Sequence, residues 1–253
     1  MRLAILSDVH ANLPALETVL EEVASSEAEQ TWCLGDIVGY GAHPDECARL
    51  VSERCELSLI GNHDLAVLGD LETESFSPAA AAAVKWTRAT ATGETLRYLR
   101  GLEPAAEDRE VALYHGSPRD PVWEYVLWPD QAAECIAEQA QRVSLVGHSH
   151  VALYFTLDDA HGDADPDQPP PEIRGGQAAA EAVLELSSGR WLVNPGSVGQ
   201  PRDGDPRAAW LELDTSSWRA TYHRVEYDID RAAAAIVESD LPDQLGKRLY
   251  AGQ

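Results

Sequence analysis

The sequence predicts an α/β fold with two β-sheets, each backed by helices. In the first 150 residues, short apolar runs alternate with helical patterns, which is typical of buried strands joined by crossover helices. After residue 150, the pattern becomes rich in strands. A chain of 253 residues with 44% hydrophobic composition can bury a full core, and we expect a single domain over residues 1–253.

The first half reads as alternating strands and helices. We expect strands over residues 2–7, 31–34, 56–60, 111–114 and 143–146. Asn12 is placed to cap the first helix, and a second helix starts at His43-Pro44 and runs to about residue 54. A helical insertion over about residues 64–101 contains helices over 77–90 and 93–99, and another helix is expected over 129–141.

The second half reads mainly as β-structure. We expect strands over residues 151–157, 182–186, 191–193, 208–213 and 218–227. The segment over about residues 158–177 is rich in Asp, Pro and Gly, and we expect an exposed loop there. A helix over about residues 228–239 is expected to close the chain.

Charge and hydropathy exclude several classes of partner. The formal net charge of −24 argues against bulk nucleic-acid binding and against binding to anionic membranes, both of which need clustered Lys and Arg. Any phosphate-bearing substrate must therefore be attracted locally. The first apolar run is too short for a signal peptide, and no apolar run is long enough to span a membrane, so we expect a cytoplasmic protein with reduced cysteines.

Potential metal ligands follow five of the expected strands. They are carboxylates, an amide and imidazoles, in chain order Asp8, His10, Asp36, Asn62, His115, His148 and His150. Ligands gather at the carboxyl ends of strands in α/β folds. Seven groups are too many for one ion but suit two ions about 3.5–4 Å apart that share a carboxylate. A set without thiolate favours manganese, iron, zinc, cobalt or nickel. The centre would stay cationic, because two carboxylates and a hydroxide do not cancel two dications.

These motifs resemble those of the calcineurin-like metallophosphoesterases, in particular the small bacterial and archaeal phosphodiesterase branch. The matching motifs are Asp8-Val9-His10, Gly35-Asp36, Gly61-Asn62-His63-Asp64, His115 and Gly147-His148-Ser149-His150, and residues 194–199 also look like this branch. The resemblance implies a four-layer αββα sandwich of two mixed sheets flanked by helices.

The resemblance also implies roles for individual residues. Asp8, His10 and His150 would bind one metal ion, Asn62, His115 and His148 would bind the other, and Asp36 would bridge them. His63 would stabilise the transition state or protonate the leaving oxygen, and Asp64 would orient His63 and favour its charged form. A hydroxide that bridges the metals would attack phosphorus in line with the leaving group.

The implied substrates are small phosphodiesters, with phosphomonoesters and dinucleoside polyphosphates as alternatives and manganese as the first metal to test in vitro. The Asp-Arg-Gly motif of the protein phosphatases is missing, and Arg202 is our candidate for a substitute substrate-binding cation. Trp123 and Tyr125 are candidates to flank a nucleotide base. The alternative function is a non-catalytic interaction scaffold on the same fold. We expect solvated positions for His43, His161 and His223, and the oligomeric state stays open.

Overall fold

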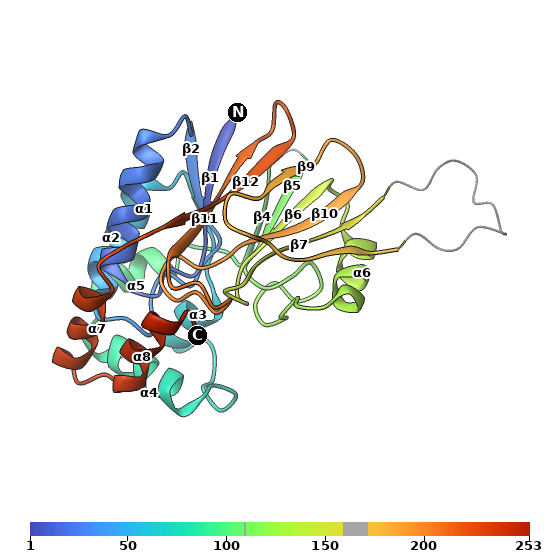
Figure 1. Cartoon of the computed structure of the whole chain (residues 1–253). Coiled ribbons are helices and arrows are strands. Elements are labelled where there is room, and N and C mark those ends of the chain that lie inside the picture. The colour runs from blue at the N-terminus through green and yellow to red at the C-terminus, as the bar shows by residue number, and fades with distance from the viewer. Residues whose placement is uncertain (109, 159–171) are drawn as a thin grey trace.

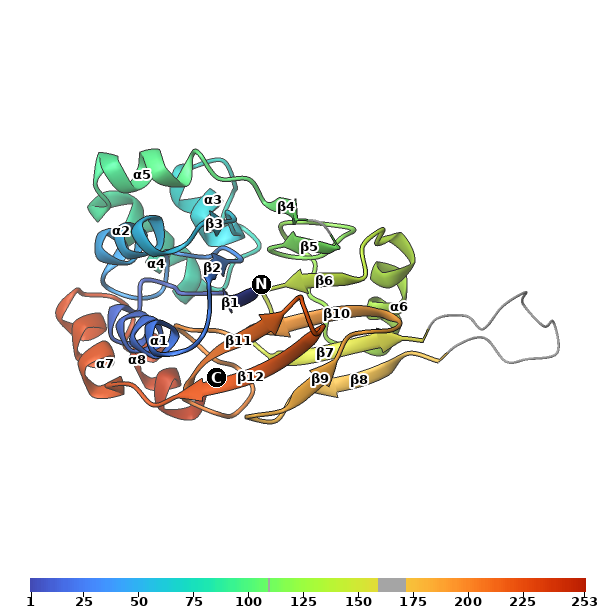
Figure 2. The ribbon, with the colours of Figure 1, turned by 90° about the horizontal axis from the view of Figure 1, so that it is seen from above.

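Two mixed six-stranded sheets pack face to face in the computed structural model, which describes residues 1–108, 110–158 and 172–253. Most helices lie on the outer face of the first sheet, and one helix covers the second (Figures 1 and 2). The predicted arrangement of two mixed sheets flanked by helices, consistent with an αββα sandwich, is confirmed.

The first sheet joins strands from both ends of the chain, so β1 sits at its centre beside β11. Its strand order is β3 (Leu57–Ser58), β2 (Gln30–Cys33), β1 (Arg2–Leu6), β11 (Ala208–Asp214), β12 (Arg219–Val225) and β9 (Val183–Glu185). The first three strands are parallel, and the remaining pairs are antiparallel. The carboxyl ends of β1, β2 and β3 therefore open at the same edge of the sheet.

The second sheet also combines parallel and antiparallel strands, and its parallel strands lie at the centre. Its strand order is β4 (Ala105–Asp108), β5 (Val111–Tyr114), β6 (Val143–Val146), β10 (Arg190–Pro195), β7 (Ala152–Leu157) and β8 (Arg174–Gln177). Strands β5, β6 and β10 run parallel, and the outer strands pair antiparallel. This sheet also collects the carboxyl ends of its parallel strands at one edge.

The helices follow from local signals in the sequence. They are α1 (Leu13–Ser25), α2 (Pro44–Arg54), α3 (Asn62–Leu68), α4 (Pro78–Thr90), α5 (Gly93–Leu99), α6 (Pro129–Glu138), α7 (Ile229–Glu238), α8 (Asp243–Lys247) and the 3₁₀ helix η1 (Arg248–Ala251). The predicted cap is present, because Asn12 Oδ1 accepts a hydrogen bond from Ala15 N at 3.3 Å. Ser77 caps α4 in the same way through Ala80 N.

Side-chain alternation along β1 shows how the layers are held together. Leu3 and Ile5 pack between the two sheets, whereas Ala4 and Leu6 pack against the helices of the first sheet. All four side chains are fully buried. Because successive residues of a strand point to opposite faces, one short run of apolar residues serves two cores. A third core beneath α6 contains Phe155 and Leu192 from the second sheet.

Several expectations need correction. Strands β4 and β8 were not expected, and β8 occupies the end of the segment predicted as a loop over 158–177, of which residues 159–171 lie outside the described part. The predicted closing helix is α7, but α8 and η1 follow it. The helix expected over 129–141 ends at Glu138.

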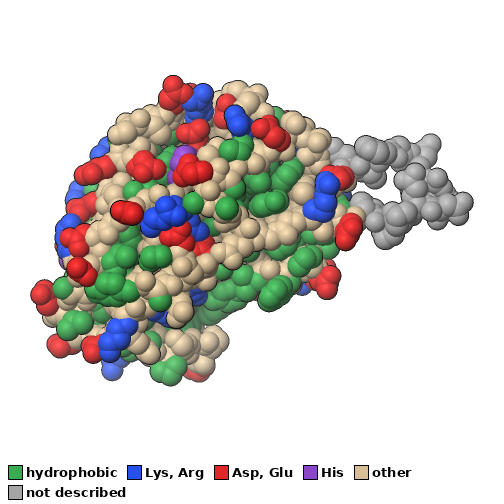
Figure 3. All heavy atoms as spheres, viewed as in Figure 1, with side chains coloured by type: hydrophobic (Ala, Val, Ile, Leu, Met, Phe, Trp, Pro, Cys, Tyr) green, Lys and Arg blue, Asp and Glu red, His purple; other side chains and the backbone are tan. Residues whose placement is uncertain are grey.

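The acidic surface and the free cysteines agree with what the composition predicted. On the face in Figure 3, acidic side chains are spread widely, and basic side chains occur as smaller groups among them. The four cysteines are free thiols. Within the described ranges, no helix combines the length and the apolar character that crossing a bilayer requires.

Candidate metal centre

The seven predicted ligands come together where the parallel strands of both sheets end. Asp8 and His10 follow β1, Asp36 follows β2, Asn62 opens α3, His115 follows β5, and His148 and His150 follow β6. Each of the seven is at most 2% exposed. So many buried polar groups need partners, because burying an unpaired polar group is unfavourable.

The first group of potential ligands consists of Asp8, His10, Asp36 and His150. His10 Nε2 lies 3.0 Å from His150 Nε2 and 3.5 Å from Asp36 Oδ2. His150 Nε2 lies 3.4 Å from Asp8 Oδ1. Ligands about 2.1 Å from a common ion lie roughly 3.0–3.5 Å apart. These separations therefore fit one divalent cation.

The second group consists of Asp36, His115 and His148, with the amide of Asn62 beside them. His115 Nε2 lies 3.6 Å from Asp36 Oδ2 and 3.1 Å from Asn62 Oδ1. Asp36 Oδ2 thus faces ligand atoms of both groups. This is the position that a carboxylate shared between two ions would occupy.

Backbone carbonyls select the ring nitrogens that face the centre. The Nδ1 atoms of three histidines each face a carbonyl oxygen: that of His10 at Val38 (3.2 Å), that of His115 at Leu34 (2.9 Å) and that of His150 at Gln200 (2.7 Å). A donated Nδ1–H leaves Nε2 as the lone-pair atom, the usual arrangement of a metal-ligating histidine.

Unpaired atoms give an independent test of whether metal ions fit. Within the described residues, Asp8 Oδ1, Asp36 Oδ2 and His148 Nε2 are buried and have no hydrogen-bond partner. The two carboxylate oxygens face Nε2 atoms of the ligand groups, and His148 belongs to the second group. Buried polar atoms in native proteins are normally satisfied, so three orphans at one place indicate a missing partner. A pair of cations would satisfy all three.

Burial shifts the pKa values of these groups. It raises the pKa of Asp8 to about 7 and raises the pKa of Asp36 well above its ordinary value. It lowers the pKa values of His10, His148 and His150 well below the ordinary value, with nearby positive groups adding to the effect. The histidines are therefore held neutral, the form in which imidazole binds metal.

The backbone at the ligands is unusual. Five of the seven ligands have positive φ, between 50° and 62°: Asp8, His10, Asp36, His148 and His150. This left-handed region is uncommon for residues with a side chain and costs on the order of 1 kcal/mol each. Strained backbone of this kind gathers at functional sites, where the surrounding structure enforces it.

The segment over residues 194–199, which comprises the end of β10 and the loop after it, braces the ligand segments. Asn194 Nδ2 donates to Gly147 O at 2.6 Å and to Ser149 Oγ at 3.0 Å, beside the two histidines that follow β6. Ser197 Oγ donates to Asp8 O at 2.8 Å. In the sequence, this segment stood out only through the family resemblance, and its bracing role became visible in the structure.

His63 lies beside the centre, but Asp64 does not orient it, which corrects our expectation. The carboxylate of Asp64 accepts hydrogen bonds from the backbone amides of Ile37, Val38 and Gly61 at 2.9–3.2 Å. Among the described residues, His63 Nδ1 has no hydrogen-bond partner, and burial lowers the pKa of His63 rather than favouring the charged form. Asp64 is therefore a brace for the loop that carries Asp36.

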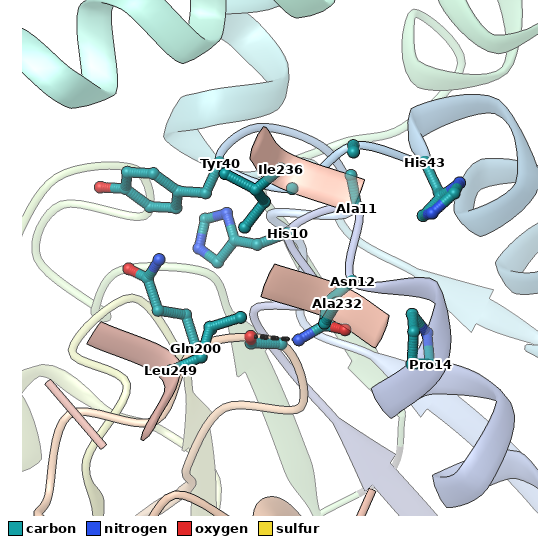
Figure 4. A pocket seen from close by; sticks show the side chains of 13 residues that line it. His10, Ala11, Asn12, Pro14, Tyr40, His43, Gln200, Ala232, Ile236 and Leu249 are labelled. Carbon is teal, nitrogen blue, oxygen red and sulfur yellow. Dashed lines mark hydrogen bonds between the residues drawn. The ribbon is translucent and has the colours of Figure 1, made fainter. Parts of the chain in front are cut away.

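Tyr40 was not singled out in the sequence, yet its ring packs within the centre. Its centroid lies 4.6 Å from that of His10 and 4.3 Å from that of His63. Figure 4 shows Tyr40, His10 and Gln200 around one pocket. Arg202 Nη2 donates to Tyr40 Oη at 3.2 Å, which places the guanidinium of Arg202 beside the Tyr40 ring.

The other aromatic and histidine candidates also have defined places. Tyr125 stacks on His148 with ring centroids 3.9 Å apart and remains 41% exposed, and Trp123 contacts His148 edge-on. His223 stacks on Trp210, and His43 lies near Glu46, so neither belongs to the two ligand groups. His161 falls outside the described residues.

The fold and the site define a metallophosphoesterase class of protein: two mixed sheets with a cluster of Asp and His side chains at their strand ends. The model of the calcineurin-like phosphoesterase superfamily domain matches residues 1–216. The chain belongs to this superfamily.

Known proteins similar to this chain include three whose matches span nearly its full length. A metallophosphoesterase from Sphaerobacter thermophilus has a crystal structure that is 42% identical, with a TM-score of 0.84 and coverage of 100% of this chain and 99% of that chain. An uncharacterized protein of Methanocaldococcus jannaschii is 35% identical over 257 residues, covering 99% of this chain and 98% of that protein. A hypothetical protein of Pyrococcus horikoshii, 20% identical with a TM-score of 0.77 and coverage of 100% and 98%, shares the fold.

Proposed function

We propose that this protein hydrolyses phosphodiester bonds with two divalent cations bound at the strand ends. Asp8, His10 and His150 hold one ion, and Asn62, His115 and His148 hold the other. The proposal rests mainly on Asp36 Oδ2, which lacks a partner among the described residues and lies 3.5 Å from His10 Nε2 and 3.6 Å from His115 Nε2. A carboxylate oxygen shared between two sets of ligands suits two ions better than one.

When bound, the two ions supply hydroxide at neutral pH and neutralise charge on the phosphoryl oxygens. The protein contributes the arrangement around them. The Nδ1 contacts of His10, His115 and His150 with backbone carbonyls keep the Nε2 atoms aimed at the centre. Arg202, at the rim beside Tyr40, is placed to bind a substrate oxygen.

His63 is the residue that we assign to stabilising the transition state. Its backbone N–H donates to Asp36 Oδ1 at 2.8 Å, which ties it to the carboxylate between the two ligand groups. A Cβ atom added to Gly39 would lie 2.7 Å from His63 Nδ1, so this nitrogen packs against the Gly39 backbone. The opposite nitrogen, Nε2, is then the atom that would donate a hydrogen bond to a phosphoryl or leaving oxygen in the transition state, which a neutral imidazole can do.

Small phosphodiesters are the substrates that we propose first, with phosphomonoesters and dinucleoside polyphosphates as alternatives, and manganese is the metal that we propose for assays. A cytoplasmic location and a single domain over residues 1–253 stay predictions. The acidic surface is consistent with a small substrate, because a long polyanion would be repelled.

Hydrolysis of bis-p-nitrophenyl phosphate tests the proposal. We expect activity with manganese that EDTA abolishes and that manganese restores. Asp36→Asn is the matched control, because it retains the side-chain shape but removes the charge between the ligand groups. Absence of hydrolysis by folded protein with manganese, zinc, cobalt, nickel and iron would instead favour the scaffold function.

A further inference from the structure

A pair of arginines beside the metal centre shares one uncharged acceptor. Arg202 Nη2 donates to Gln200 Oε1 at 3.1 Å, and Arg248 Nη1 donates to the same oxygen at 3.4 Å. The two nitrogens therefore lie within about 6.5 Å of each other, the sum of the two bonds. Gln200 itself is only 2% exposed, so the amide oxygen between the two cations is sheltered from water.

Neither arginine of this pair forms a direct salt bridge within the described residues. Among the described residues, no carboxylate oxygen lies within 4.0 Å of the guanidinium nitrogens of Arg202 or Arg248, although the chain carries 43 acidic residues. Burial and the neighbouring Arg202 lower the pKa of Arg248. Arg202 Nε is also buried without a partner within the described part of the chain. Two adjacent cations without a counter-ion are unfavourable unless an anion joins them.

The two arginines differ in their distance from the ligands. Arg202 is part of the site: its backbone N–H donates to His150 O at 3.0 Å, and its charge lowers the pKa values of Asp8 and Asp36. Arg248 comes from η1 and also lines a surface hollow between the start of α4 and the C-terminal segment. The cations therefore form a row that leads from the metal ligands outward, past Tyr40, to this hollow.

We propose that Arg202 and Arg248 bind a second phosphoryl group of the substrate, next to the one that reacts at the metal centre. The inference rests on the proposed function and narrows it to organic polyphosphates, in which the reacting phosphoryl group is linked through oxygen to another. A simple diester has one phosphate with a single negative charge, which the two ions already neutralise. A polyphosphate brings further charge, which guanidinium groups recognise well. In a protein of net charge −24, such a local pair is needed to hold a polyanion.

Isothermal titration calorimetry of the manganese-loaded protein tests this without relying on turnover. The probe is α,β-methylene adenosine diphosphate, which has two phosphoryl groups and no P–O–P bond to cut. Inorganic phosphate is the probe with a single phosphoryl group. We expect Arg248→Gln to weaken binding of the diphosphate probe about tenfold or more and that of phosphate less than about threefold, as for loss of one charged hydrogen bond.

Arg219→Gln is the matched control, because it removes the same charge from an exposed arginine at the start of β12, which lines neither the metal centre nor the hollow. It should change neither dissociation constant by more than about twofold. Equal weakening of both probes by Arg248→Gln, equal effects of the two variants, or no weakening would each overturn the proposal. A cooperative thermal unfolding transition would show that each variant is folded. Failure of the proposed function appears separately, as absence of bis-p-nitrophenyl phosphate hydrolysis by the unaltered protein.

Discussion

Adding one methyl group at Gly61 should damage the metal centre without changing any ligand. A Cβ atom at this position would lie 2.1 Å from Asp36 Oδ1 and 2.5 Å from Asp36 N. Ordinary contacts to a Cβ atom begin at 3.4 Å, so the carboxylate or the backbone must move by about 1.3 Å. The backbone of Gly61 is extended, with φ −103° and ψ 178°, which any residue can adopt. The effect of Gly61→Ala is therefore steric alone.

The expected magnitude follows from this displacement. Misplacing a catalytic group by about 1 Å lowers the rate by roughly 100-fold, and overpacking a buried site destabilises it by about 1–3 kcal/mol. We therefore expect Gly61→Ala to lose at least about 100-fold in kcat/KM, to bind less manganese and to unfold at a lower temperature. Elemental analysis after manganese loading, thermal unfolding and bis-p-nitrophenyl phosphate hydrolysis measure the three quantities.

Gly93→Ala is the control for Gly61→Ala. Gly93 is the first residue of α5, and no atom lies within 4 Å of its added Cβ among the described residues. This variant should keep its metal content and its activity, with stability unchanged or raised by up to about 1 kcal/mol. Two bound manganese ions and wild-type unfolding in Gly61→Ala would refute the close packing of Gly61 against Asp36.

Four further predictions follow from the same structure. Asp36→Asn should depress both metal content and turnover, whereas His63→Ala should keep most of the metal and lose about 100-fold or more in rate; equal metal loss in both, by elemental analysis, would show that His63 is misassigned. Asn194→Ala leaves the buried partners of its amide unpaired, so chemical denaturation should show a loss of about 3 kcal/mol in the free energy of unfolding, and a loss below about 1 kcal/mol would contradict the bracing role. Asp240→Gly should stabilise the protein by roughly 0.5–1 kcal/mol, because this exposed residue follows α7 with φ 56°, and a lower melting temperature would count against this reasoning. Manganese at about 100 times its dissociation constant should add about 2.7 kcal/mol, or roughly 5–11 °C in melting temperature, over protein kept in EDTA; no shift would mean that the folded protein does not bind manganese specifically.

The parts of the fold that the sequence predicted well are those with strong local signals. Strands β5 and β6 and helices α4 and α5 lie close to where their apolar runs and capping residues placed them. Strand β8 was missed because it contains Gly175 and Gly176 and pairs at the edge of the sheet, where the neighbouring strand β7 decides the conformation. Strand β4 has no β-branched residue, and its pairing with β5 likewise depends on tertiary context.

The candidate site likewise contains residues that the sequence indicated and residues that only the folded structure revealed. Asp, His and Asn at the ends of apolar runs indicated the ligand cluster, because strand ends of an α/β fold meet at one edge. The groups that hold the ligands in place could not be predicted from the sequence, because they depend on contacts between distant segments. Tyr40 and Arg248 carry no local signal, and Asp64 was assigned to His63 because they are neighbours in sequence. Its carboxylate instead binds the amides of residues 37 and 38, which only the folded chain brings within reach.

Two features of the protein without metal act against its stability. The left-handed backbone at five ligands stores on the order of 5 kcal/mol. The carboxylates of Asp8 and Asp36 are fully buried, and each has one oxygen without a partner in the described chain. Cations would offset the unpaired charge directly, and the strain holds the ligand atoms where the cations need them. The segment over residues 194–199 and the carboxylate of Asp64 supply the hydrogen bonds that keep the ligand segments in place. The strained backbone and the unpaired carboxylate oxygens, which lower stability without metal, are thus the same features that prepare the centre for metal, which is why metal binding and folding should be coupled in this protein.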